Sequence, residues 1–329
     1  MKKLPCIAIA IWVFAAHKAS AQVPGAGLAA NYPAKTVRII VGFAPGGGID
    51  IVARICAQKF TESLGQSFIV ENRPGASGII AADLVAKANP DGYTLLMTAD
   101  VHTISPSLFS KLPFDSVKDF TAIGTVASGP QSITVNPNMS VRSLSELIAS
   151  AKANSGKIAY ASAGSGTLTH IAMELFRSMA GIKLVHVPYK GSGASVLAVL
   201  GDEVPVLPIA LGQALPHAKT GKLRMLAVTT AERTELALDI PTVAEAASLP
   251  GYEAVSWQGL LAPAGTPAAI INKLSSEITR QLQLRDVREQ LAARAWVPNP
   301  RAPGAFASLI KSDIVKWGKV VRESGIKMD

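Results

Sequence analysis

The strongest constraint on the fold is the regular alternation of short strand-like runs with longer stretches of helical spacing. Residues 37–41 are mostly β-branched and predict a strand. After a glycine-rich turn, apolar side chains recur every three or four positions over residues 52–64 and predict a helix. The same pattern restarts after Gly129 and Pro130, where residues 143–153 predict another helix. Repeated strand–helix units predict an α/β protein with a largely parallel sheet, and 329 residues exceed what one core usually holds, so we expect two lobes.

The remaining elements follow from the same signals, because turn residues bound the strands and apolar spacing marks the helices. We expect further strands at residues 67–70, 93–98, 157–162, 185–187 and 225–228, and a last apolar run covers residues 259–263. We expect further helices at residues 79–88, 168–179, 267–282, 287–293 and 303–318. No repeat of about 20 to 50 residues is present, so solenoids and propellers are excluded.

Residues 1–21 have the features of a cleaved secretory signal. Two lysines supply the positive start, residues 4–16 form an apolar run, and residues 19–21 are the small residues of a cleavage site. A membrane anchor needs roughly 20 apolar residues, whereas this run is shorter and is followed by a histidine and a lysine. We therefore expect export to the periplasm and a mature chain that begins at Gln22.

The composition is that of a folded protein, since 49% of the residues are hydrophobic and only two are cysteine. The formal charge of +9 falls by three when the signal is removed, and the remaining basic residues are scattered. A nucleic-acid-binding surface needs clustered Lys and Arg, so we expect no nucleic-acid partner. Cys56, the one cysteine outside the signal, shares helical spacing with Val52, Phe60 and Leu64, which predicts a buried apolar role.

Two glycine-rich turns, at residues 43–50 and 162–167, each follow a predicted strand and open a predicted helix. At such a junction, free backbone N–H groups and the positive end of the helix dipole face whatever lies above the turn. Glycine also serves close packing in tight strand–helix connections, so one such turn alone would indicate little. One turn in each expected lobe favours an anion held in the crevice between the lobes.

Enzyme and metal motifs do not fit these turns. The first turn has Gly48-Ile49 where a phosphate-binding loop needs Lys and Ser or Thr, it lacks GxGxxG, and the second turn lacks GxSxG. Asp50 also has a purely structural reading as the N-cap of its helix. The histidines outside the signal show no metal-ligand spacing, so we expect neither a metal nor a cofactor. They are His102, His170, His186 and His217.

Six short motifs occur in order along the chain. They are IVGFAPGG with DIVAR at residues 40–54, VENRPGA at 70–76, NPDGYTL at 89–95, YASAGSGT at 160–167, HVPYKG at 186–191 and PTVAE at 241–245. Together they resemble the periplasmic substrate-binding proteins of tripartite tricarboxylate transporters, also called the Bug family. The resemblance extends from about Tyr32 to the C-terminus, and six ordered motifs over that length make it highly specific.

The resemblance implies a two-lobed periplasmic-binding-protein fold (Venus flytrap, type II) with two crossovers between the lobes. The first lobe would comprise residues 32–130 and 251–329, and the second residues 131–250. In the family, a carboxylate is held between the two glycine turns, largely by backbone amides and ordered water. The implied ligand-binding residues are Phe43, Ala44, Pro45, Gly46, Gly47 and Asp50 on one side, with Ala161, Ser162, Ala163, Gly164, Ser165, Gly166, Thr167 and His170 on the other.

Two departures from the family pattern bear on the ligand. Pro208-Ile209-Ala210 stands where many members have Phe-Asp-Asn, and Gly48-Ile49 stands where Pro-Thr is usual. The first change removes an acid and an amide that would receive a ligand ammonium group, while Ile49 and Ile209 would make the cleft more apolar. These departures favour a dicarboxylate, aromatic ones such as terephthalate included, over an amino acid.

We therefore expect a periplasmic, monomeric solute-binding protein that is not an enzyme. It would bind a small-molecule carboxylate and deliver it to the membrane subunits of a tripartite tricarboxylate-type transporter. The same fold in the service of a sensor kinase is an alternative that the sequence does not separate. A secreted hydrolase using Ser162 or Ser165 with His170 is the remaining alternative, and no carboxylate is evidently placed to orient that histidine.

Overall fold

The computed structural model describes residues 31–326, so the predicted signal at residues 1–21 lies outside the described residues. A ten-stranded sheet runs through the molecule in the order β2-β1-β3-β9-β4-β7-β5-β6, and β8 and β10 also pair with β4. The strands are β1 (Val37–Val41), β2 (Phe68–Asn72), β3 (Thr94–Ala99), β4 (Phe120–Val135), β5 (Ala159–Ser162), β6 (Val185–Pro188), β7 (Val206–Ala210), β8 (Arg224–Val228), β9 (Val255–Pro263) and β10 (Val297–Arg301). The helices are α2 (Gly48–Leu64), α3 (Ile79–Ala86), α4 (Val101–Leu108), α5 (Leu144–Ala153), α6 (Leu168–Ala180), α7 (Ser192–Leu200), α8 (Leu211–Lys219), α9 (Val243–Ala247), α10 (Ala268–Gln281), α11 (Arg285–Ala292) and α12 (Pro303–Ser324), with a short 3-10 helix at Ala76–Gly78.

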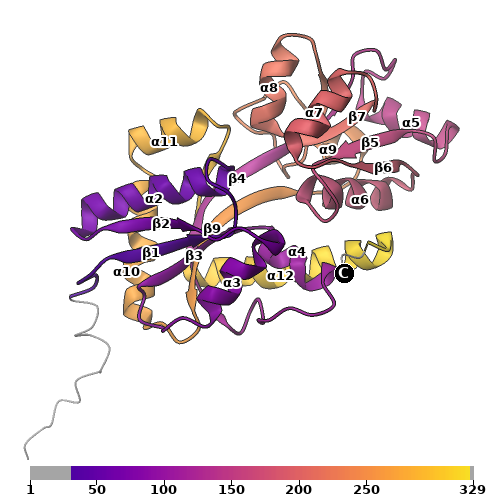
Figure 1. The fold of residues 1–329 in the computed structure, drawn as a ribbon. Coiled ribbons are helices and arrows are strands. Elements are labelled where there is room, and N and C mark those ends of the chain that lie inside the picture. Colours follow the sequence, from indigo (N-terminus) through magenta and orange to yellow (C-terminus); the bar gives the residue numbers. More distant parts are fainter. Residues whose placement is uncertain (1–30, 327–329) are drawn as a thin grey trace, which may run out of the picture.

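The two halves of this sheet form two lobes, which Figure 1 shows connected by β4 and β9. In the first lobe, β2, β1 and β3 are parallel, and β9 runs antiparallel to β3 and to residues 120–130 of β4. In the second lobe, β5 and β6 are parallel, and residues 131–135 of β4 pair with β7. Strand β4 therefore changes its partner between Pro130 and Gln131 and carries the chain from one lobe into the other. The α/β architecture agrees with the predicted class.

The predicted strand–helix units form because their apolar faces are buried. In α2, Val52, Cys56 and Phe60 pack in one core cluster with β1, and the helix ends at Gly65 in the left-handed conformation. Cys56 is 2% exposed, which confirms its predicted apolar role. In the second lobe, the apolar face of α6 is buried in the same way, with Phe176 fully enclosed.

Several elements were not predicted, and some of them contain residues that interrupt the sequence pattern. Helix α4 contains Pro106 and short polar side chains, which weaken its helical signal. Strand β4 continues through Gly129 and Pro130, where the sequence predicts a boundary, and it changes its partner at that point. Pro208-Ile209-Ala210 lies within β7. The α7, α8, α9 and β10 segments were also missed.

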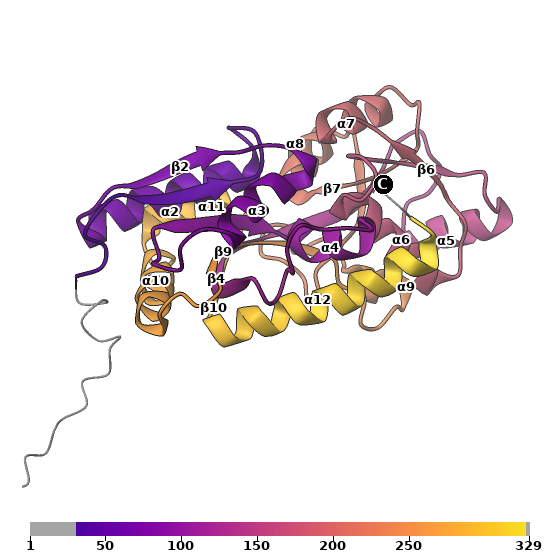
Figure 2. The same cartoon turned by 60° about the horizontal axis from the view of Figure 1, so that its bottom comes forward.

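Helix α12 lies along both lobes, as Figure 2 shows. Near its start, Phe306 and Ile310 belong to a core cluster of the first lobe. Near its end, Trp317, Val320 and Val321 belong to the main core cluster of the second lobe. The last helix therefore connects the two cores by packing, in addition to the two crossing strands.

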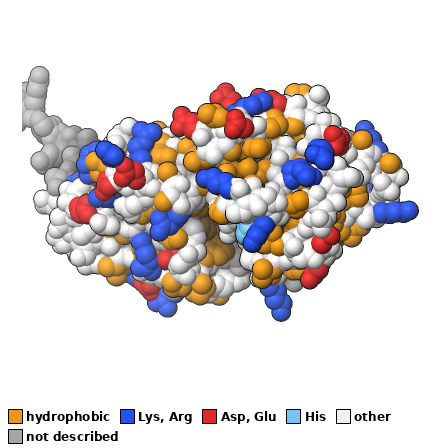
Figure 3. Space-filling model, turned by 90° about the horizontal axis from the view of Figure 1, so that it is seen from above, with side chains coloured by type: hydrophobic (Ala, Val, Ile, Leu, Met, Phe, Trp, Pro, Cys, Tyr) orange, Lys and Arg blue, Asp and Glu red, His pale blue; other side chains and the backbone are white. Residues whose placement is uncertain are grey.

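The distribution of charge can be followed on one face of the molecule. On the face shown in Figure 3, Lys and Arg side chains are dispersed among acidic and apolar ones and form no continuous patch. Within residues 31–326, none of the helices has both the length and the apolar character that a bilayer span requires.

Candidate functional site

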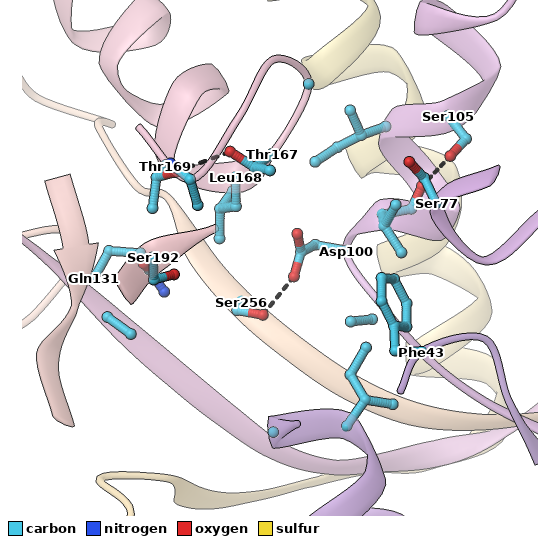
Figure 4. Close-up of a pocket in the computed structure, with 18 of the residues that line it drawn as sticks. Phe43, Ser77, Asp100, Ser105, Gln131, Thr167, Leu168, Thr169, Ser192 and Ser256 are labelled. Atoms are coloured by element: carbon cyan, nitrogen blue, oxygen red, sulfur yellow. Dashed lines mark hydrogen bonds between the residues drawn. The ribbon is translucent and has the colours of Figure 1, made fainter. Parts of the chain in front are cut away.

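A cavity of about 370 Å³ lies between the lobes, where both glycine-rich turns contribute to its wall. The start of α2, helix α4, the turn before α6 and the crossing strands all line it. Figure 4 shows Thr167 and Leu168 on one side and Phe43 on another, with Asp100 and Ser256 between them. The lining residues are Phe43, Gly48, Ile49, Ser77, Ala99, Asp100, Val101, Ile104, Ser105, Leu108, Phe109, Gln131, Ala163, Ser165, Gly166, Thr167, Leu168, Thr169, Ser192, Ala210, Ser256, Gln258 and Trp296.

The first glycine-rich turn is held in shape by the buried carboxylate of Asp50. This carboxylate accepts hydrogen bonds from the Gly46 backbone N–H at 2.9 Å, from Arg54 Nε at 3.0 Å and from Asn72 Nδ2 at 2.9 Å. Burial opposes its ionisation, but these hydrogen bonds and the Arg54 charge outweigh burial and hold the pKa of Asp50 below its ordinary value. The N-cap of α2 is Gly47, so the structural reading of Asp50 as the N-cap is wrong.

The second glycine-rich turn is held by side chains of its own segment. The Ala163 N–H donates to Thr169 Oγ1, the Gly164 N–H to Ser162 Oγ, and the Gly166 N–H to His170 Nδ1, each at 3.1 Å. These three backbone donors are therefore used inside the turn. The amides that would hold an anion must come from elsewhere in the segment.

Helices α2 and α6 both start at the cavity without a side-chain cap. Their N-caps are Gly47 and Thr167, and neither of these two residues accepts a hydrogen bond through its side chain from the helix. The first N–H groups of a helix have no partner inside the helix, and the positive end of its dipole lies there. Because the first residues of both helices, Gly48 and Leu168, line the cavity, two such ends meet at it. This arrangement suits an anion.

A buried polar network supports the second turn from below. His170 stacks on His186, whose Nε2 lies 2.6 Å from Ser162 Oγ. Next to the two rings, Glu174 accepts a hydrogen bond of 2.6 Å from the Tyr160 hydroxyl. Burial, followed by the electrostatic influence of His186 and Arg177, lowers the pKa of His170 to about 3. The ring is therefore neutral near pH 7, with its proton on Nε2 because Nδ1 accepts from Gly166.

This network does not form a hydrolase site. The serine–histidine pair is Ser162 with His186, whereas the hydrolase alternative used His170. Ser162 is 0% exposed and does not line the cavity, so a substrate carbonyl would not reach it. In the described range 31–326, no group of three or more His, Cys, Asp or Glu is arranged to hold a metal ion.

A group of polar side chains lines the cavity at the crossing strands. Ala99 of β3 pairs in register with Gln258 of β9, and the next residue, Asp100, accepts a short hydrogen bond from the Ser256 hydroxyl. Burial raises the pKa of Asp100 to about 6, the Ser256 hydrogen bond opposes this rise, and the charge of Asp313 adds to it. Asp100 is thus an acid inside the cavity. Comparison with the family pattern identified only the acid that is missing at Pro208-Ile209-Ala210.

The rest of the cavity wall is largely apolar. Phe43, Ile49, Val101, Ile104, Leu108, Phe109, Leu168 and Trp296 contribute apolar side chains. Within the part of the chain that the structure describes, no Lys, Arg or His lines this cavity. An anion bound here would therefore depend on backbone N–H groups and hydroxyls, and its organic part would meet an apolar surface.

The structure places some of the predicted site residues in the cavity wall and others outside it. Those that line it are Phe43, Ile49, Ala163, Ser165, Gly166 and Thr167. Those that do not are Ala44, Pro45, Gly46, Gly47, Asp50, Ala161, Ser162, Gly164, His170 and Ile209. Asp50, Ser162 and His170 shape the turns, whereas Ala161 and Ile209 lie in a core cluster of the second lobe.

Sequence reasoning missed the cavity residues on α4, β4, β9 and the segment before β10. Asp100 carried one usable signal, because it lies two residues after the predicted strand at residues 93–98, and ligands bind at the carboxyl ends of parallel strands. Gln131, Ser256, Gln258 and Trp296 carried none. Their placement depends on the pairing of strands far apart in the sequence.

Comparison with known proteins gives consistent findings. The family model described as "Tripartite tricarboxylate transporter family receptor" matches residues 52–326. The chain is 36% identical to the protein BugT of Bordetella pertussis over 300 residues, which are 91% of this chain and 92% of BugT. Its fold is similar to that of R. palustris Rpa4515 with adipate, at a TM-score of 0.78 and 32% identity, covering 90% of this chain and all of that one. It is also similar to MatC from Rhodopseudomonas palustris with bound malate, at a TM-score of 0.74 and 33% identity, covering 88% of this chain and all of that one.

Proposed function

Because this chain belongs to the tripartite tricarboxylate transporter receptor family, whose members are periplasmic solute-binding proteins and not enzymes, we propose that it captures a dicarboxylate between its lobes and delivers it to a membrane transporter. The fold is the two-lobed α/β fold predicted from the sequence. The cavity supports the proposed ligand class. It combines two uncapped helix starts with an otherwise largely apolar wall.

The electrostatics of the cavity carry this proposal. A carboxylate needs hydrogen-bond donors, and the starts of α2 and α6 supply N–H groups and positive dipole ends from both lobes. One ligand anion that bonds to both helix starts would hold the lobes together. Binding would then shift the population toward a closed form, which a membrane partner recognises.

Two relatives support a dicarboxylate. Adipate and malate both have two carboxylates, and the proteins that carry them are 32% and 33% identical to this chain over nearly their whole length. The apolar wall around Phe43, Phe109 and Trp296 further suits an aromatic or otherwise apolar body between the two anionic groups. We therefore include aromatic dicarboxylates among the proposed ligands.

We further propose the lobe limits and the site residues inferred from the sequence. The first lobe comprises residues 32–130 and 251–329 and the second residues 131–250, a division supported by the change of partner along β4. The end of α12 is the exception, because Trp317, Val320 and Val321 pack in the core of the second lobe. The ligand contacts come from the turns at residues 43–50 and 161–170, with Ile209 behind the second turn. We expect a monomer that works with transporter subunits. Genes next to a sensor kinase and without a permease would favour the signalling alternative.

The test is thermal unfolding and calorimetric titration of the mature chain from Gln22. The panel contains succinate, malate, adipate, citrate, terephthalate, benzoate, aspartate and glutamate, and dimethyl adipate is the uncharged control. A ligand at about 1,000 times its Kd should add about 4.1 kcal/mol to the free energy of unfolding, which is a shift of several degrees. We expect a shift with at least one dicarboxylate and none with the diester. If no carboxylate binds and the denatured protein releases no carboxylate, the proposal is wrong.

A further inference from the structure

Three oxygen-bearing side chains gather on the cavity wall, and they come from segments that are far from the two glycine-rich turns in the sequence. Ser256 and Gln258 are two positions apart on β9, so their side chains lie on the same face of the strand. Ala99 pairs with Gln258 across β3 and β9, which places the following residue, Asp100, beside Ser256. The Ser256 hydroxyl donates to Asp100 Oδ1, as Figure 4 shows.

This part of the cavity wall has more hydrogen-bond acceptors than donors. Asp100 is 7% exposed and Gln258 is 1% exposed, so protein replaces most of the water around them. Among the described residues, Gln258 Oε1 has no hydrogen-bond partner. The Asp100 carboxylate accepts hydrogen bonds from the Ser256 hydroxyl and from its own backbone N–H, and in the cavity wall that residues 31–326 form no Lys, Arg or His is present to pair with its charge.

An unpaired buried acceptor and a buried carboxylate without a cation are both costly. The side chain of Asp313 on α12 is itself an acid and adds repulsion to the Asp100 carboxylate. The sequence keeps an acid here although a serine or an asparagine would avoid this cost. A ligand that supplies hydrogen-bond donors and a positive charge would remove it.

We propose that Asp100, with Ser256 and Gln258, forms a specificity subsite for an ammonium group, so that the ligand is an amino-bearing carboxylate. Its carboxylate lies at the starts of α2 and α6, and its ammonium group donates to Asp100 and Gln258. This proposal rests on the proposed function and refines it. It also reverses the preference against amino acids that the sequence suggested, because the missing acid at Pro208-Ile209-Ala210 is replaced by Asp100 from another strand end.

The experiment uses ligands that differ only at one carbon. Succinate, malate and aspartate share four carbons and two carboxylates and carry hydrogen, hydroxyl or ammonium at carbon 2. Glutarate with glutamate and adipate with 2-aminoadipate repeat the comparison at greater lengths. Each is titrated calorimetrically into the mature protein and into the Asp100→Asn, Gln258→Met and Asp202→Asn variants. Asp202 is exposed in the turn after α7, and its substitution makes the same chemical change outside the cavity.

We expect the amino-bearing member of at least one pair to bind about tenfold or more tightly than its plain partner, since a hydrogen bond to a charged group is worth about this factor. Asp100→Asn should abolish that ratio, Gln258→Met should reduce it, and Asp202→Asn should leave it unchanged. Equal affinity within every pair, with dicarboxylates still bound, would overturn the ammonium subsite and leave the proposed function intact. The same holds if Asp100→Asn strengthens binding of both members equally, which would make Asp100 merely repulsive. Absence of binding by the whole series would overturn the ammonium subsite, and the wider panel with citrate and the aromatic acids would then decide the proposed function separately.

Discussion

The imidazole rings of His170 and His186 stack with their centroids 3.7 Å apart and 10° between their planes. Two rings this close cannot both carry a positive charge without strong repulsion. Each ring also fixes a part of the second glycine-rich turn, because His170 accepts the Gly166 N–H and His186 is hydrogen-bonded to Ser162. The shape of the turn therefore depends on neutral histidines.

This relationship predicts how His170 responds to pH. Burial above all lowers its pKa to about 3, whereas the unfolded chain takes up the proton near pH 6.5. Between these values the unfolded state binds more protons, so His170 makes the protein less stable as the pH falls from 6.5 toward 3. NMR titration of the ring protons should show no protonation of His170 above about pH 4. A midpoint near 6.5 would contradict the neutral stack.

Asp100 has the opposite pH dependence. Burial raises its folded-state pKa to about 6. Between about pH 4 and pH 6 the folded state therefore still binds a proton that the unfolded state has released. The stability that this proton supplies is present in acid and is lost as the pH rises through 6. Asp100→Asn should therefore stabilise the unliganded protein at pH 7.5 by about 2 kcal/mol and have little effect at pH 4.

Urea unfolding of the parent protein and of the Asp100→Asn variant at both pH values measures this difference. A variant that is less stable than the parent at pH 7.5 would mean that the carboxylate is satisfied without a ligand. A stabilised variant that no longer prefers amino-bearing ligands would show a residue kept for binding at a cost to stability.

The Asp50 hydrogen bonds predict a separate effect on the first turn. Asp50→Asn keeps the size of the side chain but removes the charge that binds Arg54 and one acceptor for the Gly46 and Asn72 donors. We expect ligand affinity to fall by about tenfold, because the start of α2 is no longer held against the cavity. Titration at a temperature where both proteins are folded separates this effect from lost stability.

The control is Glu62→Gln on the same helix, which removes an exposed partner of Lys59. Exposed ion pairs contribute little, so affinity should stay within about twofold of the parent. Equal losses in both variants would assign the effect to the charge of α2 rather than to the turn.

A glycine on the crossing strand limits the position of a cavity residue. A Cβ atom at Gly129 would lie 2.4 Å from the ring of Trp296, which lines the cavity. Gly129→Ala should therefore displace this ring, destabilise the protein by about 1–3 kcal/mol and weaken binding. The double variant with Trp296→Phe should recover part of the loss, because the smaller ring leaves room. Unfolding and titration of both single variants and the double variant form the cycle, and additive losses would show that the two residues do not interact.

The predictable part of this structure is local. Residues 37–41 and 52–64 formed β1 and α2 as expected, because each pattern buries one apolar face on the same core. The turn between them was recognised from its glycines, and both turns reach the cavity. The strand-to-helix pattern therefore predicted the part of the site that we propose binds an anion.

The position of Asp100 beside Ser256 was not predictable in the same way. Ser256 lies 156 residues after Asp100, and only the register between β3 and β9 brings their side chains together. No pattern within a single segment encodes that register. Strand β4 was missed for a related reason, since Gly129 and Pro130 resemble a turn unless the close approach of Trp296 is known.

Helix α12 places the end of the described chain on the lobe opposite its start. Lys35 precedes β1 in the first lobe, whereas Glu323 lies near the end of α12, where Ser178 of α6 donates a hydrogen bond to it. A donor dye at position 35 and an acceptor dye at position 323 would therefore sit on different moving bodies, outside the cavity. If the ligand closes the lobes as proposed, the distance between the two dyes changes. Energy transfer between them would then report the concentration of the ligand, without any insertion into the fold.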